Sequence, residues 1–424
     1  MIRSTCSLLE VPLDYSNHSA GTVNLGIIKR PGESEDAQEV LVNPGGPGGS
    51  SVAMVLKDSE AIQEKIGTQY SLVGIDPRGI ANSGPSSDCF LNFSHIARNA
   101  FLSEVFTPPD ITSDYGLRQN HQYMRAYGQW CSSVYAVNGT AKYAGTVPTA
   151  QDMLHYIELR AKSKSEPPEE AKLWFYGLSY GTTLGSTFAS LYPNRIGRMI
   201  IDGVMDLEDH YNGGWSTAIV DADEASRYFF KRCFEAGPKL CQFHQNATSW
   251  EELEERYSSI LANLKESPIA VGDLALSQLG AEAFGVTLTP TVFTWKDLVN
   301  LVFTTSYLLS PASYTSMDLT LVELQTGGTQ HTGMIPIKAQ ISSSFPTHDQ
   351  RMSRTLVSCL DANRRFNTSE FPQYKSFVEG MHNTSQYAGL NAAALGGPVC
   401  ADLDIAPPES QTFDGKLLTS MRLR

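Results

Sequence analysis

The sequence predicts an α/β fold with a mostly parallel sheet, and three observations support that prediction. Short apolar strands alternate with helices over roughly the first 200 residues, as they do in a parallel sheet covered by helices. Two of the strands end in glycine-rich turns that lead directly into a helix. Beyond about residue 205 the alternation stops and helical stretches dominate, which indicates a helical insertion over one end of the sheet.

Each predicted strand is a short run of apolar and β-branched residues, which is typical of buried parallel strands. These strands are expected at Val23–Arg30, Glu39–Asn43, Tyr70–Asp76, Lys172–Leu178 and Ile196–Ile201. The helices predicted between them are Ser50–Ile66, Thr149–Ala161 and Tyr180–Leu191. Thr149 followed by Asp152 approximates a capping box, so we expect the second helix to begin there.

The later part of the chain is predicted to form a lid. Further helices are expected at Thr217–Glu235, Ser249–Lys265 and Trp295–Leu309, whereas Ser103–Asp114 is predicted to be a loop because it carries prolines and acids. We therefore expect an α/β core at residues 1–204, a mainly helical lid at 205–400, and the start of a return to the core at 401–424.

The composition excludes several classes of protein. Of the 424 residues, 41% are hydrophobic and 18% are charged, which excludes wholesale disorder. The net charge of −13 argues against a nucleic-acid partner, which requires a basic face. No apolar run approaches the ~18 residues of a membrane-spanning helix, so no membrane span is expected. Cys-x-x-Cys and His-x-x-x-His spacings are absent, so we expect neither a metal nor an organic cofactor.

The cysteines and sequons favour a secretory, oxidising compartment. The seven cysteines are Cys6, Cys89, Cys131, Cys233, Cys241, Cys359 and Cys400. Six Asn-x-Ser/Thr sequons begin at Asn17, Asn92, Asn138, Asn246, Asn367 and Asn383. The N-terminus lacks the apolar segment of a signal peptide, so we expect a secretory-type protein whose export signal is missing. Cytosolic thiols with chance sequons are the alternative.

The segment Gly177-Leu178-Ser179-Tyr180-Gly181 has the G-x-S-x-G pattern of a nucleophile elbow. It lies between a predicted strand and a predicted helix, which is the context that the pattern requires. The two glycines let the helix fold back over the strand, and the helix N-terminus favours negative charge developing beside the serine. A surface serine on an ordinary strand–turn–helix is the alternative interpretation.

The glycine-rich segment Asn43–Ser50 (NPGGPGGS) follows another buried strand. An oxyanion hole needs two backbone N–H groups aimed at one point, and glycines let the main chain approach a substrate carbonyl closely. A phosphate-binding loop would carry Gly-Lys-Ser/Thr, but this segment contains no lysine. We therefore interpret it as an oxyanion loop, with a glycine turn that binds nothing as the alternative.

In their order along the chain, several segments resemble the tripeptidyl-aminopeptidase-like branch of the α/β-hydrolase superfamily, which is related to the prolyl aminopeptidases. These segments are Val11–Tyr15, Asn43–Gly49, Gly74–Gly79, Tyr176–Gly185 and Asp202–Asp206. The resemblance extends through nearly the whole chain and implies the α/β-hydrolase fold with a helical lid. The family is common as secreted or vacuolar enzymes of fungi and actinobacteria, so we expect a similar location here.

The resemblance also implies roles for individual residues. Ser179 is the expected nucleophile, and the backbone N–H groups of Gly46 and Tyr180 are the expected oxyanion hole. The disulfide bonds implied by the family are Cys89–Cys131, Cys233–Cys241 and Cys359–Cys400, which leaves Cys6 without a partner. The expected substrate is a peptide or another small molecule.

One part of the family pattern is missing. A serine hydrolase of this fold needs an acid and then a histidine after the nucleophile, and the family places them in an Asp-x-x-Thr-Pro setting and beside a C-terminal glycine. Neither setting occurs in the sequence. We therefore expect that the last two core strands are missing with them, as in a chain truncated at both ends or a decayed copy. A triad rebuilt with Asp206 and His210 is the alternative.

Three functions fit these observations. The first is a serine hydrolase that releases residues from peptide N-termini, in which lid acids such as Glu224, Glu235 and Glu251 would bind the substrate amino group. The second is a hydrolase of esters, lactones or thioesters in fungal secondary metabolism. The third is a catalytically inactive relative, because a serine without a base retains only binding and oxyanion effects.

Overall fold

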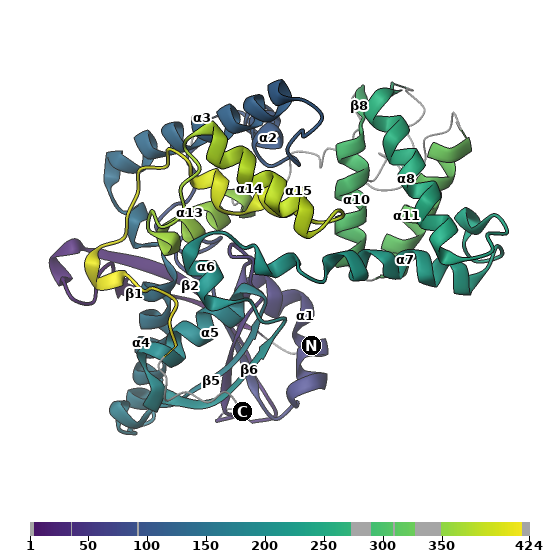
Figure 1. Ribbon diagram of the computed structural model, residues 1–424. Helices are drawn as coiled ribbons and strands as arrows, with labels where there is room; N and C mark the ends of the chain where they lie inside the picture. The colour runs from purple at the N-terminus through teal and green to yellow at the C-terminus, as the bar shows by residue number, and fades with distance from the viewer. Residues whose placement is uncertain are drawn as a thin grey trace.

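The computed structural model describes residues 4–34, 36–90, 93–272, 290–307, 310–326 and 349–417. These residues form an α/β part and a helical layer that lies across one end of the sheet (Figure 1). The helical layer draws on two separate stretches of the chain, one between β4 and α4 and the other after β6.

The described residues form a six-stranded sheet in the order β1-β2-β4-β3-β5-β6. The strands are β1 (Thr5–Pro12), β2 (Thr22–Arg30), β3 (Glu39–Asn43), β4 (Ser71–Ile75), β5 (Leu173–Leu178) and β6 (Ile196–Asp202). The pairs β1–β2 and β2–β4 are antiparallel, whereas β4, β3, β5 and β6 run parallel. Every residue of β3 and β4 is buried because helices cover both faces of these central strands.

Three helices cover the two faces of the sheet. Helix α1 (Ser51–Ile66) packs on one face, and α4 (Thr146–Ser163) and α5 (Tyr180–Leu191) pack on the other (Figure 1). Successive side chains of a strand point to opposite faces. Accordingly, Val42 of β3 belongs to the apolar cluster with α1, and Leu41 belongs to the cluster with α4 and α5.

The helical layer has an apolar core of its own. Its helices are α2 (His95–Val105), α3 (Asp114–Asn138), α6 (Leu207–Asn212), α7 (Ala222–Ala236), α8 (Trp250–Glu266), α10 (Trp295–Tyr307), α11 (Pro311–Thr326), α13 (Gln350–Ala362), α14 (Phe371–Thr384) and α15 (Gly389–Leu395). The strands β7 (Ile269–Val271) and β8 (Thr291–Phe293) pair in antiparallel orientation. Buried side chains of α3, α7, α8, α10, α11, α13 and α14 meet in one cluster, so α3 packs with the lid although it precedes the Ser179 turn.

Most element predictions for the α/β part are confirmed, with bounds that agree to within one residue for the predicted strands and for α1 and α5. The predicted start of α4 is wrong, because the helix begins at Thr146 after the N-cap Gly145. The Thr149 hydroxyl instead donates to Gly145 O at 3.0 Å within that helix. The predicted loop at Ser103–Asp114 is also partly wrong, because α2 continues to Val105.

In the lid, the three predicted helices are present as α7, α8 and α10. The predicted start of the first is wrong, because α7 begins at Ala222 and Thr217–Ile219 forms a separate 3-10 helix. Residues 308–309 of the last prediction lie outside the described residues. The sequence analysis did not identify β1 or α3. Both elements depend on distant partners, since β1 pairs with β2 and α3 packs against the lid core.

The structure contains three disulfide bonds, and they join the pairs that the family resemblance implies. They are Cys89–Cys131, Cys233–Cys241 and Cys359–Cys400. All of them lie in or against the core of the helical layer. Cys6, on the sheet edge, is free and exposed.

Five of the sequon asparagines are exposed, as attachment of a glycan would require. They are Asn17, Asn138, Asn246, Asn367 and Asn383. Asn92 lies outside the described residues. Glycosylation at these positions stays a prediction.

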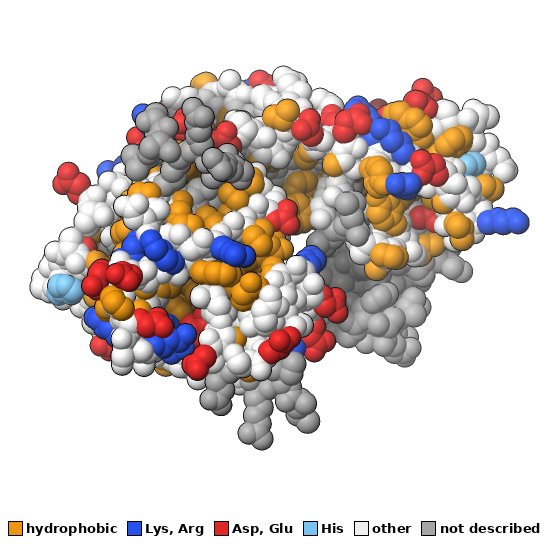
Figure 2. Space-filling view, turned by 90° about the horizontal axis from the view of Figure 1, so that it is seen from below, with side chains coloured by type: hydrophobic (Ala, Val, Ile, Leu, Met, Phe, Trp, Pro, Cys, Tyr) orange, Lys and Arg blue, Asp and Glu red, His pale blue; other side chains and the backbone are white. Residues whose placement is uncertain are grey.

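The strand β6 lies at the edge of the described sheet and is far more exposed than the central strands. Only three of its seven residues are even half-buried, and Ile200 is 50% exposed. Seen from below, the α/β part carries a broad apolar area between charged side chains (Figure 2). None of the described helices is both long and apolar enough to span a membrane.

A buried ion pair joins three segments of the α/β part. Arg78 follows β4, is 0% exposed, and donates from Nε and Nη2 to the two carboxylate oxygens of Asp152 on α4, each at 2.8 Å. It also donates to Pro12 O at the end of β1 and to Leu13 O just after it, each at 2.6 Å. The guanidinium therefore satisfies backbone carbonyls of one segment while it fixes the helix of another.

We predict that Asp152→Asn lowers the free energy of unfolding by about 3–5 kcal/mol, because it leaves a buried guanidinium without its negative partner. Urea denaturation followed by tryptophan fluorescence measures this change. Glu235→Gln removes an exposed ion pair with Arg232 and serves as the control, with a midpoint close to that of the wild type. Equal midpoints for all three proteins would contradict the structural role of Asp152.

Candidate active site

Ser179 occupies a sharp turn between β5 and α5. Its φ of 54° and ψ of −121° lie in a sparsely populated region for a residue with a side chain. The Ser179 N–H donates to Asp202 O on β6 at 3.0 Å, and the Thr182 N–H donates to Ser179 O at 2.8 Å. These bonds hold the strained turn on both sides, and the strand–turn–helix predicted from the G-x-S-x-G pattern is confirmed.

The two glycines of this pattern leave no room for a side chain. A Cβ on Gly177 would lie 2.5 Å from Gly181 O, and a Cβ on Gly181 would lie 2.8 Å from Asn43 O. Both distances are far below van der Waals contact. The glycines are therefore required by the close approach of β5, α5 and the end of β3.

The glycine-rich loop lies directly against the Ser179 turn. A Cβ on Gly45 would be 2.3 Å from Leu178 O and 2.8 Å from Ser179 Cβ. Gly45 also has a φ of 87°, which favours glycine. Its N–H donates to Asn43 Oδ1 at 2.9 Å, and its carbonyl accepts from the Gly49 N–H at 3.0 Å. The loop is thus folded by its own hydrogen bonds.

Gly46 and Tyr180, the predicted oxyanion-hole residues, both lie at this junction. Tyr180 is the first residue of α5, so its N–H belongs to the helix end whose N–H groups lack intrahelical acceptors. A Cβ on Gly45, the neighbour of Gly46, would lie 2.8 Å from Tyr180 N. The fold therefore brings Ser179, Gly46 and Tyr180 together, and their catalytic roles stay predictions.

The side chain of Ser179 is partly exposed, and its hydroxyl forms no hydrogen bond with any other described residue. Two of the buried histidines are hydrogen-bonded to other residues. His121 Nε2 is 2.8 Å from Thr368 O in the lid, and His210 Nε2 is 2.9 Å from Asp361 Oδ2. Within the described part of the chain, no His–acid pair is hydrogen-bonded to Ser179.

The alternative triad of Asp206 and His210 is not assembled. The Asp206 side chain is exposed and caps α6 by accepting from the Asp209 N–H at 2.9 Å. The His210 side chain is buried and its ring packs against those of Tyr180, Tyr211 and Trp215. The hydrogen bond of His210 Nε2 goes to Asp361, which the sequence analysis did not consider.

Two of the three lid acids considered as binders of a substrate amino group form ion pairs on the surface of α7. Glu224 pairs with Arg227 and Lys231 on the surface of α7, and Glu235 pairs with Arg232. Glu251 is exposed in the first turn of α8. Helices α7 and α8 extend away from α5 and the Ser179 turn (Figure 1).

The lid helix α13, by contrast, lies on the glycine-rich loop. A Cβ on Gly48 would be 2.7 Å from Gln350 O and 3.2 Å from Arg354 N, and a Cβ on Gly46 would be 3.2 Å from Gln350 Nε2. Sequence reasoning missed these neighbours of the site. The side chain of Asp349 caps α13 and is a local signal for the start of this helix. It gives no signal that the helix contacts the glycine-rich loop.

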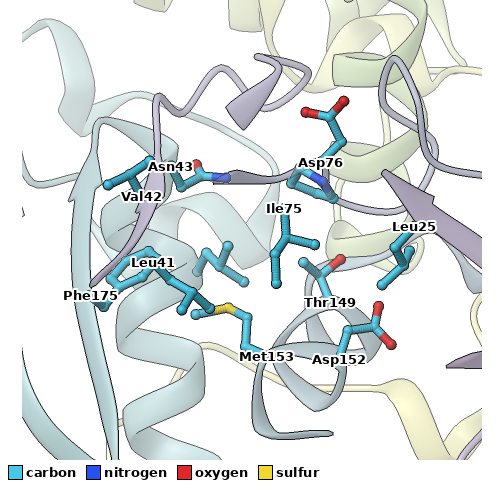
Figure 3. A pocket seen from close by; sticks show the side chains of 12 residues that line it. Leu25, Leu41, Val42, Asn43, Ile75, Asp76, Thr149, Asp152, Met153 and Phe175 are labelled. Atoms are coloured by element: carbon cyan, nitrogen blue, oxygen red, sulfur yellow. The ribbon is translucent and has the colours of Figure 1, made fainter. Parts of the chain in front are cut away.

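A small cavity lies between the sheet and the helices α4 and α5. A cavity lined by Leu41, Ile75 and Met153, with Asn43 and Asp76 at one end, has a volume of about 20 Å³ (Figure 3). Such a volume holds roughly one water molecule, which needs ~10–15 Å³. In the described ranges, no group of three or more His, Cys, Asp or Glu side chains is placed to hold a metal ion.

Comparison with known families agrees with this geometry. Residues 39–280, more than half of the chain, match the family described as the alpha/beta hydrolase fold. The chain belongs to the α/β-hydrolase family. The matching segment begins at β3 and includes the glycine-rich loop, the Ser179 turn and the start of the lid.

Several curated proteins are similar to parts of this α/β hydrolase. Serine protease Hip1 of Mycobacterium tuberculosis is 29% identical over 202 residues, which are 47% of this chain and 36% of the relative. Tripeptidyl aminopeptidase of Streptomyces lividans is 28% identical over 225 residues, or 52% of this chain and 38% of the relative. Carboxylesterase B of M. tuberculosis is 31% identical over 149 residues, which are 35% of this chain and 27% of the relative. The chain thus spans less than two fifths of the length of these relatives.

We predict that Gly45→Ala destabilises the protein by about 3 kcal/mol. The left-handed backbone costs a residue with a side chain roughly 1–2 kcal/mol, and forcing a Cβ against the Ser179 turn adds about 1–3 kcal/mol. Chemical denaturation gives the free energy of unfolding.

Gly139→Ala separates these two contributions. Gly139 also has a positive φ, of 65°, but a Cβ there would meet nothing within 4 Å. We therefore expect this variant to lose only about 1–2 kcal/mol. Equal losses for the two variants would show that the glycine-rich loop does not press on the Ser179 turn.

Proposed function

We propose that this α/β hydrolase cleaves an amide bond at a peptide N-terminus, or an ester bond, through Ser179. The observation that carries the proposal is the contact between the strained Ser179 turn and the glycine-rich loop. A serine held at a helix N-terminus, with two sets of backbone N–H groups beside it, supports a nucleophile next to an oxyanion hole.

In the proposed reaction, Ser179 Oγ attacks the substrate carbonyl carbon and the carbonyl oxygen gains the negative charge. The N–H groups of Gly46 and Tyr180 donate to that oxygen. The serine proton passes to a base and then to the departing amine or alcohol, which leaves an acyl-serine. Water releases the acid and restores the Ser179 hydroxyl.

The names of the relatives support two substrate classes. A serine protease and a tripeptidyl aminopeptidase support peptide substrates, and a carboxylesterase supports esters. The same acyl chemistry applies to lactones and thioesters, as in fungal secondary metabolism. We favour peptides, because the matches to the protease and the aminopeptidase extend over more of this chain.

We also propose a secreted or vacuolar location. Three disulfide bonds and five exposed sequon asparagines support an oxidising, glycosylating compartment.

One observation favours a second candidate function. Within the described residues the Ser179 hydroxyl has no histidine as a hydrogen-bond partner. A serine without a base keeps the oxyanion hole and substrate binding but loses most of the rate. The second candidate is therefore a protein that binds acyl compounds without turning them over.

Ser179→Ala tests the proposed function. With a tripeptide anilide or a nitrophenyl ester as substrate, we expect the purified protein to lose turnover by about 10³-fold or more when the nucleophile is removed. Covalent labelling of the wild type by a fluorophosphonate, located by mass spectrometry, is expected at Ser179.

Ser186→Ala, on the same helix α5, is the matched control and should retain both activity and labelling. Undiminished turnover by Ser179→Ala would refute the proposal. A wild type that binds the substrate but shows neither turnover nor labelling would support the second candidate instead.

A further inference from the structure

One lid helix contacts both sides of the proposed oxyanion hole. The first turn of α13 lies on the glycine-rich loop, with Gln350 O 2.7 Å from where a Cβ of Gly48 would be. The last turn of the same helix carries Asp361. This residue reaches into the core and is hydrogen-bonded to the elements around Tyr180.

The carboxylate of Asp361 accepts three hydrogen bonds in a buried site. Oδ1 accepts from the Thr146 N–H at 2.9 Å, and Oδ2 accepts from the Thr146 hydroxyl at 2.5 Å. The third donor is His210 Nε2, at 2.9 Å from Oδ2. Asp361 is 5% exposed and its two partners are 0–1% exposed, so water does not compete for these bonds.

The direction of the next hydrogen bond follows from the chemistry of the groups. Thr146 has one hydroxyl proton and gives it to the carboxylate, so the Tyr180 hydroxyl, 2.5 Å away, must donate to Thr146 Oγ1. Burial and the nearby Asp361 charge raise the pKa of Tyr180 well above its usual range, so its hydroxyl keeps the proton. A continuous chain of donors thus runs from Tyr180 through Thr146 to Asp361.

Asp361 also lies at the N-terminus of the core helix α4. Thr146 is the first residue of α4, and Tyr180 is the first residue of α5. The N-cap of α4 is Gly145, which has no side chain to cap the helix, and Asp361 Oδ1 supplies the missing acceptor. The partial positive charge at a helix N-terminus favours a carboxylate at this place.

We propose that Asp361 and Thr146 are positioning residues for the oxyanion hole. They hold the Tyr180 side chain at its hydroxyl end and thereby fix the Tyr180 N–H beside Ser179. The first turn of α13 holds the loop that carries the Gly46 N–H. The position of the lid on the core therefore sets the distance between the Gly46 and Tyr180 N–H groups. This inference rests on the proposed function, and neither positioning residue touches the substrate.

Two substitutions of Thr146 test the inference. Thr146→Val keeps the shape of the side chain but removes its hydroxyl, whereas Thr146→Ser keeps the hydroxyl. Because loss of one oxyanion donor costs about 10²–10³-fold in kcat, we expect its displacement in Thr146→Val to cost about tenfold, with KM unchanged. Thr146→Ser should restore kcat to near the wild-type value.

Tyr156→Phe is the matched control. It removes another buried tyrosine hydroxyl, which donates to Glu39 Oε2 at 2.9 Å at the opposite end of β3. We expect its kcat and KM to match the wild type. A wild-type kcat in Thr146→Val, an equal loss in Thr146→Ser, or an equal loss in Tyr156→Phe would overturn the inference.

Failure of the proposed function is distinguishable from failure of this inference. A wild type without turnover or fluorophosphonate labelling contradicts the function alone. Amide hydrogen exchange in residues 179–184 then tests the positioning, because the hydrogen-bond chain should slow opening of this turn. We expect exchange about tenfold faster in Thr146→Val than in Thr146→Ser, and equal rates would overturn the inference.

Discussion

The buried guanidinium of Arg78 is the interaction on which the placement of the site depends. It joins the turn after β4 to the end of β1 and to Asp152 in the middle of α4. A charge this deeply buried is tolerated only when nearly all its N–H groups have acceptors, so these segments have little freedom to shift independently. Because α4 is fixed in this way, Thr146 at its N-terminus is held within hydrogen-bond distance of the Tyr180 hydroxyl.

The lid is joined to this core by specific polar contacts as well as by apolar packing. Helix α13 contacts three core turns: its first turn lies on the glycine-rich loop, Ser353 donates to Gly79 O at 3.1 Å, and Asp361 binds the start of α4. The disulfide bond Cys359–Cys400 then ties this helix to the end of the lid. Apolar surfaces alone can slide past one another, whereas hydrogen bonds at two of these turns and close backbone contact at the third favour one position of the helix.

How far the sequence predicts this structure depends on how local each signal is. The Ser179 turn and the glycine-rich loop could be predicted because their glycines are needed for contacts between neighbouring segments, and such glycines remain visible in the sequence. The start of α4 could not be predicted, because the side chain that accepts its first N–H belongs to Asp361, 215 residues further along the chain. Asp361 itself could not be singled out for the same reason. An acid two residues after a cysteine has no local signature, and its role depends on a helix that is contributed by the lid.

The strained backbone of Ser179 is held by contacts of the core and, through them, by the lid. A side-chain-bearing residue in such a conformation costs of order 1–3 kcal/mol and persists only where its surroundings leave it no alternative. Here β6 accepts the Ser179 N–H, the backbone of Gly45 presses on the turn from one side, and Tyr180 is anchored through Thr146 on the other. Two of these three constraints are in turn held by α13. The conformation of the proposed nucleophile therefore depends on the assembled lid and core. The pentapeptide Gly177–Gly181 alone does not determine it.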